Sequence, residues 1–204
     1  MKVFKQIVSI ALVLVMTSSL AACAPKEFKH QKMVDFCEDH DMDEYDDYDD
    51  FIKDCSAHLT YGTADVDGIY FSCDKSDAQD IYDVIFNRFD PYPSYDVEQT
   101  TVFVFNDGDG GVILCYLFTM EDEKDAKKLY KKYSDQDIED SEAGEEKGYT
   151  YYIETGENSK GKAMLEGFYV CGKTVLTYKT MIEDTDLIDD LCDTFKVKSP
   201  TELD

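Results

Sequence analysis

Two Cys-x-x-His pairs are the residues in this sequence best suited to holding a metal. Cys37 precedes His40, and Cys55 precedes His58; thiolate sulfur and imidazole nitrogen are the ligands of tetrahedral zinc. Apolar periodicity predicts a helix around each pair. If the two helices form an antiparallel hairpin, the rise per residue leaves the pairs roughly 10 Å apart. We therefore expect these weak candidates to pack in the core, and we predict no metal and no other cofactor.

Acidic residues are the other group abundant enough to do chemistry. The sequence has 45 Asp and Glu residues, and positions 41–50 contain seven of them. Calcium binds oxygens that converge from a loop, whereas carboxylates along a helix splay apart, and no stretch has the spacing of an EF-hand. Two carboxylates could act as the acid and base of a glycosidase, but the sequence does not select a pair. Because no nucleophile elbow, zinc-protease motif or phosphate-binding glycine loop is present, we predict no catalytic residues.

The N-terminus has the pattern of an export signal. Lys2 and Lys5 give it a positive start, and an apolar run follows over residues 7–16. This run is shorter than the ~20 residues that a membrane-spanning helix requires. A secretory signal peptide is therefore expected over residues 1–22.

The signal ends in Leu20-Ala21-Ala22-Cys23. This tetrapeptide resembles the lipobox of bacterial lipoproteins, and the resemblance covers residues 1–23 alone. It implies that Cys23 becomes the first residue of the mature protein and carries the lipid, with residues 23–27 as a short tether. The protein would then be anchored to the cell membrane on its extracytoplasmic face, since a multiply acylated cysteine dissociates very slowly.

An even number of cysteines remains after Cys23. In an exported domain, six cysteines would allow three disulfides. Each of them also lies on an apolar stripe or strand, where a reduced cysteine packs as a small hydrophobe. Both states therefore stay open, although the helical hairpin places Cys37 and Cys55 too far apart to be joined. The six are Cys37, Cys55, Cys73, Cys115, Cys171 and Cys192.

Composition limits the possible partners. The 204 residues have a net charge of −25, and removal of Lys2 and Lys5 with the signal makes it −27. Nucleic acids are bound by clustered Lys and Arg, so no nucleic-acid partner is expected. An apolar content of 43 %, with 15 Tyr and 12 Phe, is enough to fill a core.

Local patterns predict an α+β domain over residues 28–198, followed by a tail over 199–204. Residues 134–148 are acidic and glycine-bearing, and they predict a mobile loop. Residues 112–118 are apolar throughout and predict an interior strand covered on both faces. Predicted helices span 28–41, 44–59, 76–89, 122–133 and 185–195, and predicted strands span 68–73, 101–105, 112–118, 149–153, 165–171 and 174–178.

This order of elements is compatible with an antiparallel sheet of about six strands with all helices on one face. A ferredoxin-like βαββαβ core, preceded by an N-terminal helical pair, is a possible form of it.

The predicted function is a non-catalytic binding or interaction module tethered to the membrane. Tyrosines expected to be exposed among acidic residues could contact a protein or a glycan ligand. Two alternatives remain: a hydrolase of envelope glycans that uses paired carboxylates, and a protein that binds zinc or calcium. The tyrosines are Tyr45, Tyr48, Tyr92, Tyr95, Tyr149 and Tyr151.

Overall fold

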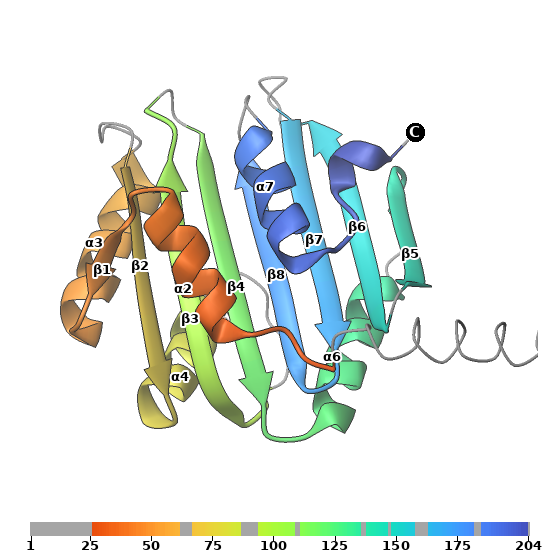
Figure 1. Cartoon of the computed structure of the whole chain (residues 1–204), viewed down its shortest axis with the longest axis horizontal. Coiled ribbons are helices and arrows are strands. Elements are labelled where there is room, and N and C mark those ends of the chain that lie inside the picture. Colours follow the sequence, from red (N-terminus) through yellow and green to blue (C-terminus); the bar gives the residue numbers. More distant parts are fainter. Residues whose placement is uncertain are drawn as a thin grey trace, which may run out of the picture.

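The computed structural model describes residues 26–61, 67–86, 94–108, 111–135, 138–146, 148–157, 163–181 and 185–203. In this part of the chain one mixed sheet is covered by helices (Figure 1). The helices are α2 (His30–Asp39), α3 (Tyr48–Tyr61), α4 (Ser76–Ile81), which continues as the π-helical turn η1 (Tyr82–Phe86), α6 (Glu123–Ser134), α7 (Asp186–Phe195) and the 3₁₀ turn η2 (Pro200–Glu202).

Eight strands form the sheet, in the order β1-β2-β3-β4-β8-β7-β6-β5. β1 pairs with β2 in parallel, and the other neighbouring pairs are antiparallel. The strands are β1 (Asp43–Tyr45), β2 (Asp67–Asp74), β3 (Val97–Asn106), β4 (Val112–Met120), β5 (Ser141–Glu146), β6 (Tyr149–Glu157), β7 (Ala163–Cys171) and β8 (Thr174–Met181).

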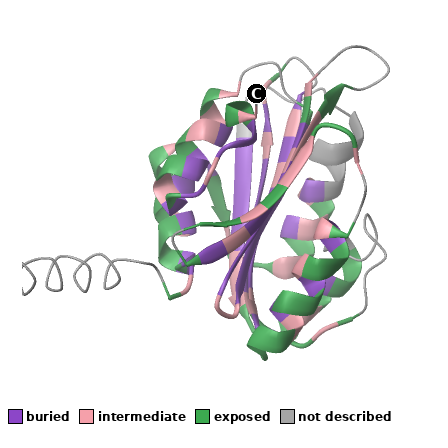
Figure 2. Cartoon of the chain, turned by 90° about the vertical axis from the view of Figure 1, so that its right-hand side faces the viewer, coloured by how far each residue is buried: buried purple, intermediate pink, exposed green. Residues whose placement is uncertain are grey.

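Helices lie on both faces of the sheet, and a separate hydrophobic core fills each interface (Figure 2). The first core lies under α2 and α7 and includes Met33 and Leu191. The second lies under α3, α4 and α6 and includes Phe51 and Leu129. The alternation of β4 explains this arrangement, because Leu117 joins the first core while its neighbours along the strand join the second.

The predicted architecture is therefore wrong in three respects. The sheet has eight strands instead of six, it contains a parallel pair, and its helices cover two faces instead of one. The ferredoxin-like core is also absent, since β2 and β3 are direct antiparallel neighbours. A split βαβ unit needs these two strands to be parallel with another strand between them.

The expected N-terminal helical pair is wrong as well. Strand β1 separates α2 from α3, and the two helices pack on opposite faces of the sheet. Residues 141–146, which we expected in a mobile loop, form the edge strand β5. Other local predictions are confirmed: α7 covers the helix predicted at 185–195, and β4 is an interior strand between β3 and β8.

Candidate functional site

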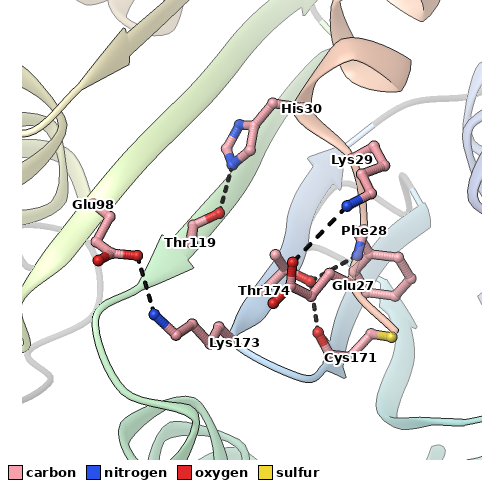
Figure 3. A network of polar contacts seen from close by, with 9 residues as sticks. All are labelled: Glu27, Phe28, Lys29, His30, Glu98, Thr119, Cys171, Lys173 and Thr174. Carbon is pink, nitrogen blue, oxygen red and sulfur yellow. Dashed lines mark hydrogen bonds and ion pairs between the residues drawn. The ribbon is translucent and has the colours of Figure 1, made fainter. Parts of the chain in front are cut away.

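The first described residues, which include the last two of the predicted lipid tether, are fastened to one end of the sheet (Figure 3). The backbone N–H of Phe28 donates to Thr174 Oγ1 at 2.8 Å. Thr174 Oγ1 in turn donates to the carbonyl of Cys171 at 2.7 Å. The Phe28 ring is buried in an edge-to-face contact with Phe195, with 5.6 Å between the ring centroids. Polar contacts with the β7–β8 hairpin and an apolar contact with α7 therefore hold this segment in place.

A close backbone approach completes this attachment. Gly172, in the turn between β7 and β8, has a φ of +62°, and a Cβ at this position would lie 2.5 Å from the carbonyl oxygen of Lys26. Only glycine leaves room for that oxygen, and glycine adopts a positive φ without steric cost. The turn at residues 172–173 thus joins β7 to β8 and also receives the N-terminal segment.

His30, the first residue of α2, fixes the other end of this segment. Its Nδ1 lies 2.8 Å from Thr101 Oγ1 on β3, and its Nε2 lies 2.9 Å from Thr119 Oγ1 on β4. Burial lowers the pKa of the imidazole to about 4. A neutral ring has one donor and one acceptor nitrogen, so one hydroxyl accepts from the ring while the other donates to it. His30 is therefore occupied as a structural clamp.

A polar hollow of about 660 Å³ opens beside the docked segment. The connection from β4 to α6, the β7–β8 turn and residues 26–27 surround it, and we call these residues (26–27, 121–125 and 172–173) the anchor end. Lys173 pairs with Glu98 at 3.2 Å (Figure 3). The lining side chains are five carboxylates, Glu27, Glu121, Asp122, Glu123 and Asp125, and two amines, Lys26 and Lys173.

The carboxylates at the anchor end do not form a metal site. No group of three or more His, Cys, Asp and Glu side chains within the described ranges is arranged to hold an ion. Asp122 serves as the N-cap of α6, where it accepts from the N–H of Lys124 at 2.8 Å. The hollow therefore presents negative charge to its surroundings without offering a set of converging ligands.

The structure does not bring together the three candidate zinc ligands whose side chains it describes. Cys37 belongs to the core under α2 and α7, whereas Cys55 belongs to the core on the opposite face. His40 is partly exposed and lies 3.9 Å from Asp190. The side chain of His58 lies outside the described residues, as does the lipidation residue Cys23.

The six cysteines after Cys23 are free thiols, five of them buried and Cys73 partly exposed. Burial raises the pKa of Cys55 and Cys73 to about 12, and that of Cys171 and Cys192 to about 11. Thiols with such pKa values are almost entirely protonated at neutral pH, and the thiolate is the nucleophilic form. These side chains are therefore suited to packing and not to catalysis.

Five of the six tyrosines predicted to be exposed are described, and each of them contacts its own chain. Tyr149 and Tyr151 are buried, so this part of the prediction is wrong. The half-buried Tyr45 donates to Asp54 Oδ2 at 2.7 Å, and the Tyr95 ring lies 5.7 Å from the ammonium of Lys128. Tyr48 packs against Phe71. Tyr92 lies outside the described residues.

A cluster around Glu142 on β5 was not indicated by the sequence. Lys198 Nζ donates to both carboxylate oxygens of Glu142, at 2.8 and 2.7 Å, and Tyr151 OH donates to the same group. These bonds, first from Lys198 and then from Tyr151, lower the pKa of Glu142. A glycosidase general acid needs a raised pKa, so Glu142 is unsuited to that role. The cluster joins β5 and β6 to the segment that follows α7.

Comparison with protein-family models, with curated proteins and with solved structures gave no match. Within the described ranges, no helix is both long and apolar enough to span a membrane.

Proposed function

We propose that this chain is a bacterial lipoprotein, acylated at Cys23 and tethered on the extracytoplasmic face of the cell membrane. Its folded domain would be a non-catalytic binding or interaction module. The observation that carries the proposal is that residues 26–30 are attached to the sheet. The described fold begins at Lys26, three residues after the expected lipid. A domain built directly onto its tether suits a protein held at a surface.

The chemistry of the groups that could act in catalysis supports the proposal that the domain is non-catalytic. His30 is bonded at both ring nitrogens, and burial raises the pKa of the cysteine thiols. The pKa of Glu142 is lowered by its partners. The cysteines are thus held as thiols, whereas a nucleophile is a thiolate, and Glu142 is held ionised, whereas a general acid is protonated. His30 has both ring nitrogens bonded to threonine hydroxyls.

Fatty-acid labelling of growing cells tests the anchor. The wild-type chain should incorporate labelled palmitate and fractionate with membranes, whereas Cys23→Ser should do neither. Cys73→Ser is the matched control, since Cys73 is the partly exposed thiol of the domain and should leave labelling unchanged. Equal incorporation into Cys23→Ser would refute acylation at this residue.

The catalytic alternative is tested separately. Purified acylated protein incubated with isolated peptidoglycan should release no more soluble sugar than the heat-denatured protein does. Release that rises with the amount of native protein would contradict the non-catalytic module and favour a hydrolase.

A further inference from the structure

The anchor end of the domain is the part of its surface that the tether brings closest to the lipid. Cys23 and Lys26 are three residues apart, and three residues span at most about 11 Å when fully extended. Lys26 lies against Gly172 in the β7–β8 turn. The lipidated residue therefore stays within about 11 Å of Lys26 and so remains near this turn. This argument depends on the acylation of Cys23 proposed above.

The attachment leaves no slack in the segment after Lys26. Phe28 is 4 % exposed and bonded to Thr174, and His30 is held by threonines on β3 and β4. Releasing the segment would expose the Phe28 ring, and burial of such a side chain contributes about 2 kcal/mol. The domain therefore cannot lengthen its own tether without losing core contacts.

From this geometry we propose that the anchor end faces the bilayer surface and that the opposite end of the sheet points away from the membrane. The register identifies that opposite end. β7 begins at Ala163, which pairs with Glu157, and ends at Cys171 beside the turn. Nine residues of strand separate these ends by about 30 Å, so Glu157 lies at the end presented outward.

Charge at the anchor end sets how closely it approaches the lipid. The hollow is lined by five carboxylates and two amines, and the Lys173 ammonium is paired with Glu98. Such a surface is repelled by anionic headgroups, but the repulsion is screened over about 8 Å at physiological ionic strength and over about 30 Å at 0.01 M salt. The domain therefore keeps its anchor end toward the lipid and its strands directed away from the membrane. It approaches an anionic bilayer more closely as the salt concentration increases.

Lipid-dependent quenching of a fluorophore tests this orientation. Acylated protein carrying either Glu121→Cys at the anchor end or Glu157→Cys at the far end is labelled and reconstituted in vesicles of phosphatidylethanolamine and phosphatidylglycerol. Both glutamates are exposed, and the buried native thiols with raised pKa react slowly by comparison. A spin label on the lipid headgroups is the quencher.

We expect the label at position 121 to be quenched several-fold more than the label at position 157. Equal quenching at the two positions, or stronger quenching at 157, would overturn the orientation. An N-terminal peptide whose mass shows no lipid on Cys23 would instead refute the acylation itself, so mass measurement distinguishes the two failures.

A longer tether provides the control. A flexible Gly-Ser insert of about 12 residues after Ala24 adds about 20 Å of mean reach, so it should keep the protein on the vesicles while removing most of the difference between the two labels. Raising salt from low to physiological concentration should increase quenching at 121 on anionic vesicles and leave it unchanged on phosphatidylcholine vesicles. The same salt response on both lipids would refute the electrostatic part.

Discussion

The carbonyl oxygen of Lys26 lies 2.5 Å from the position that a Cβ on Gly172 would occupy. Real Cβ atoms do not come this close to a backbone oxygen, so the N-terminal segment can seat on the β7–β8 turn only if residue 172 is glycine. The positive φ of Gly172 adds a second reason. One residue thus couples the turn of a hairpin to the first residues after the proposed anchor.

Replacing this glycine should weaken the attachment. Gly172→Ala should lower the free energy of unfolding by about 2 kcal/mol, since a left-handed backbone costs a non-glycine residue roughly 1–2 kcal/mol and the clash with Lys26 adds to it. Urea unfolding measures the loss, and limited proteolysis should cut first near residue 26. Gly156→Ala is the matched control, because a Cβ there meets nothing within 4 Å. Equal effects of the two substitutions would contradict the close-approach argument.

Protonation of His30 should destabilise the fold. The pKa of the buried ring is about 4, below the 6.5 of an exposed histidine, so between these values the unfolded chain binds a proton that the folded chain does not. The stability contributed by the neutral ring is complete above pH 6.5 and is lost as the pH falls toward 4. The gap sets an upper limit of about 3 kcal/mol.

His30→Gln tests this dependence. The loss of unfolding free energy between pH 7.5 and pH 4.5 should be clearly smaller in the variant than in the wild type. His40→Gln provides the comparison, because His40 is partly exposed and lies beside Asp190. If the two variants retained the same pH dependence as the wild type, His30 would not be the group responsible.

The ion pair between Lys198 and Glu142 should stabilise the edge strand β5 modestly. Its bond lengths are 2.7 and 2.8 Å, but Glu142 is 39 % exposed, so we expect at most about 1 kcal/mol of coupling. A double-mutant cycle with Glu142→Gln and Lys198→Met measures it. The more exposed pair Glu123–Lys127 on α6 is the reference, and a coupling no larger than in that pair would show that β5 does not depend on Glu142.

The lowered pKa of Glu142 also predicts how this cluster responds to acid. Because its pKa is lowered, its contribution is present above the ordinary pKa of a glutamate and is lost as the pH falls through the lowered value. Acid should therefore release the cluster only below the ordinary pKa of a glutamate. Hydrogen exchange of the β5 amides, followed as the pH is lowered, would show where the strand is released, and release above that pH would contradict the role of Glu142.

The sequence predicted local elements well where apolar periodicity was strong. Helix α7 buries Ile188, Leu191 and Phe195 at helical spacing, and its bounds agree with the prediction to within one residue. The helix predicted at 122–133 is confirmed as α6 (Glu123–Ser134), and Asp122 caps it because a carboxylate before a helix accepts from the first free N–H groups.

Long-range pairing was not predictable in this way. β5 consists of Ser, Glu, Ala and Gly, and it is a strand because its backbone pairs with β6 and its Glu142 meets Lys198, 56 residues away. β1 has three residues, too few for a periodic signal. The apolar composition of β4 did indicate cover on both faces, which is inconsistent with the one-sided arrangement of helices that we expected.

The sequence indicated the covalent part of the candidate site alone, and that part stays a prediction: residues 20–23 resemble a lipobox ending in Cys23. The seating of Lys26 on Gly172 and the clamp on His30 join residues 71 to 146 positions apart. Such contacts follow from the sheet register, and no local pattern specifies that register. The zinc candidates show that similar local motifs need not lie together. Strand β1 lies between them in the chain, and Cys37 and Cys55 pack on opposite faces of the sheet.

The reactivity of the thiols should follow their burial. In native protein at pH 8, Cys73 should react first with an alkylating reagent, because it is the partly exposed thiol among the six, and the fully buried Cys115 should react last. Even Cys73 should react far more slowly than a free cysteine, since burial and neighbouring aspartates raise its pKa to about 12. Mass spectrometry of timed samples gives the order, and Cys73→Ser should remove the first step alone. In urea without reductant all six thiols should react; a smaller number would show that disulfides form in the native protein, contrary to the free thiols of the structure.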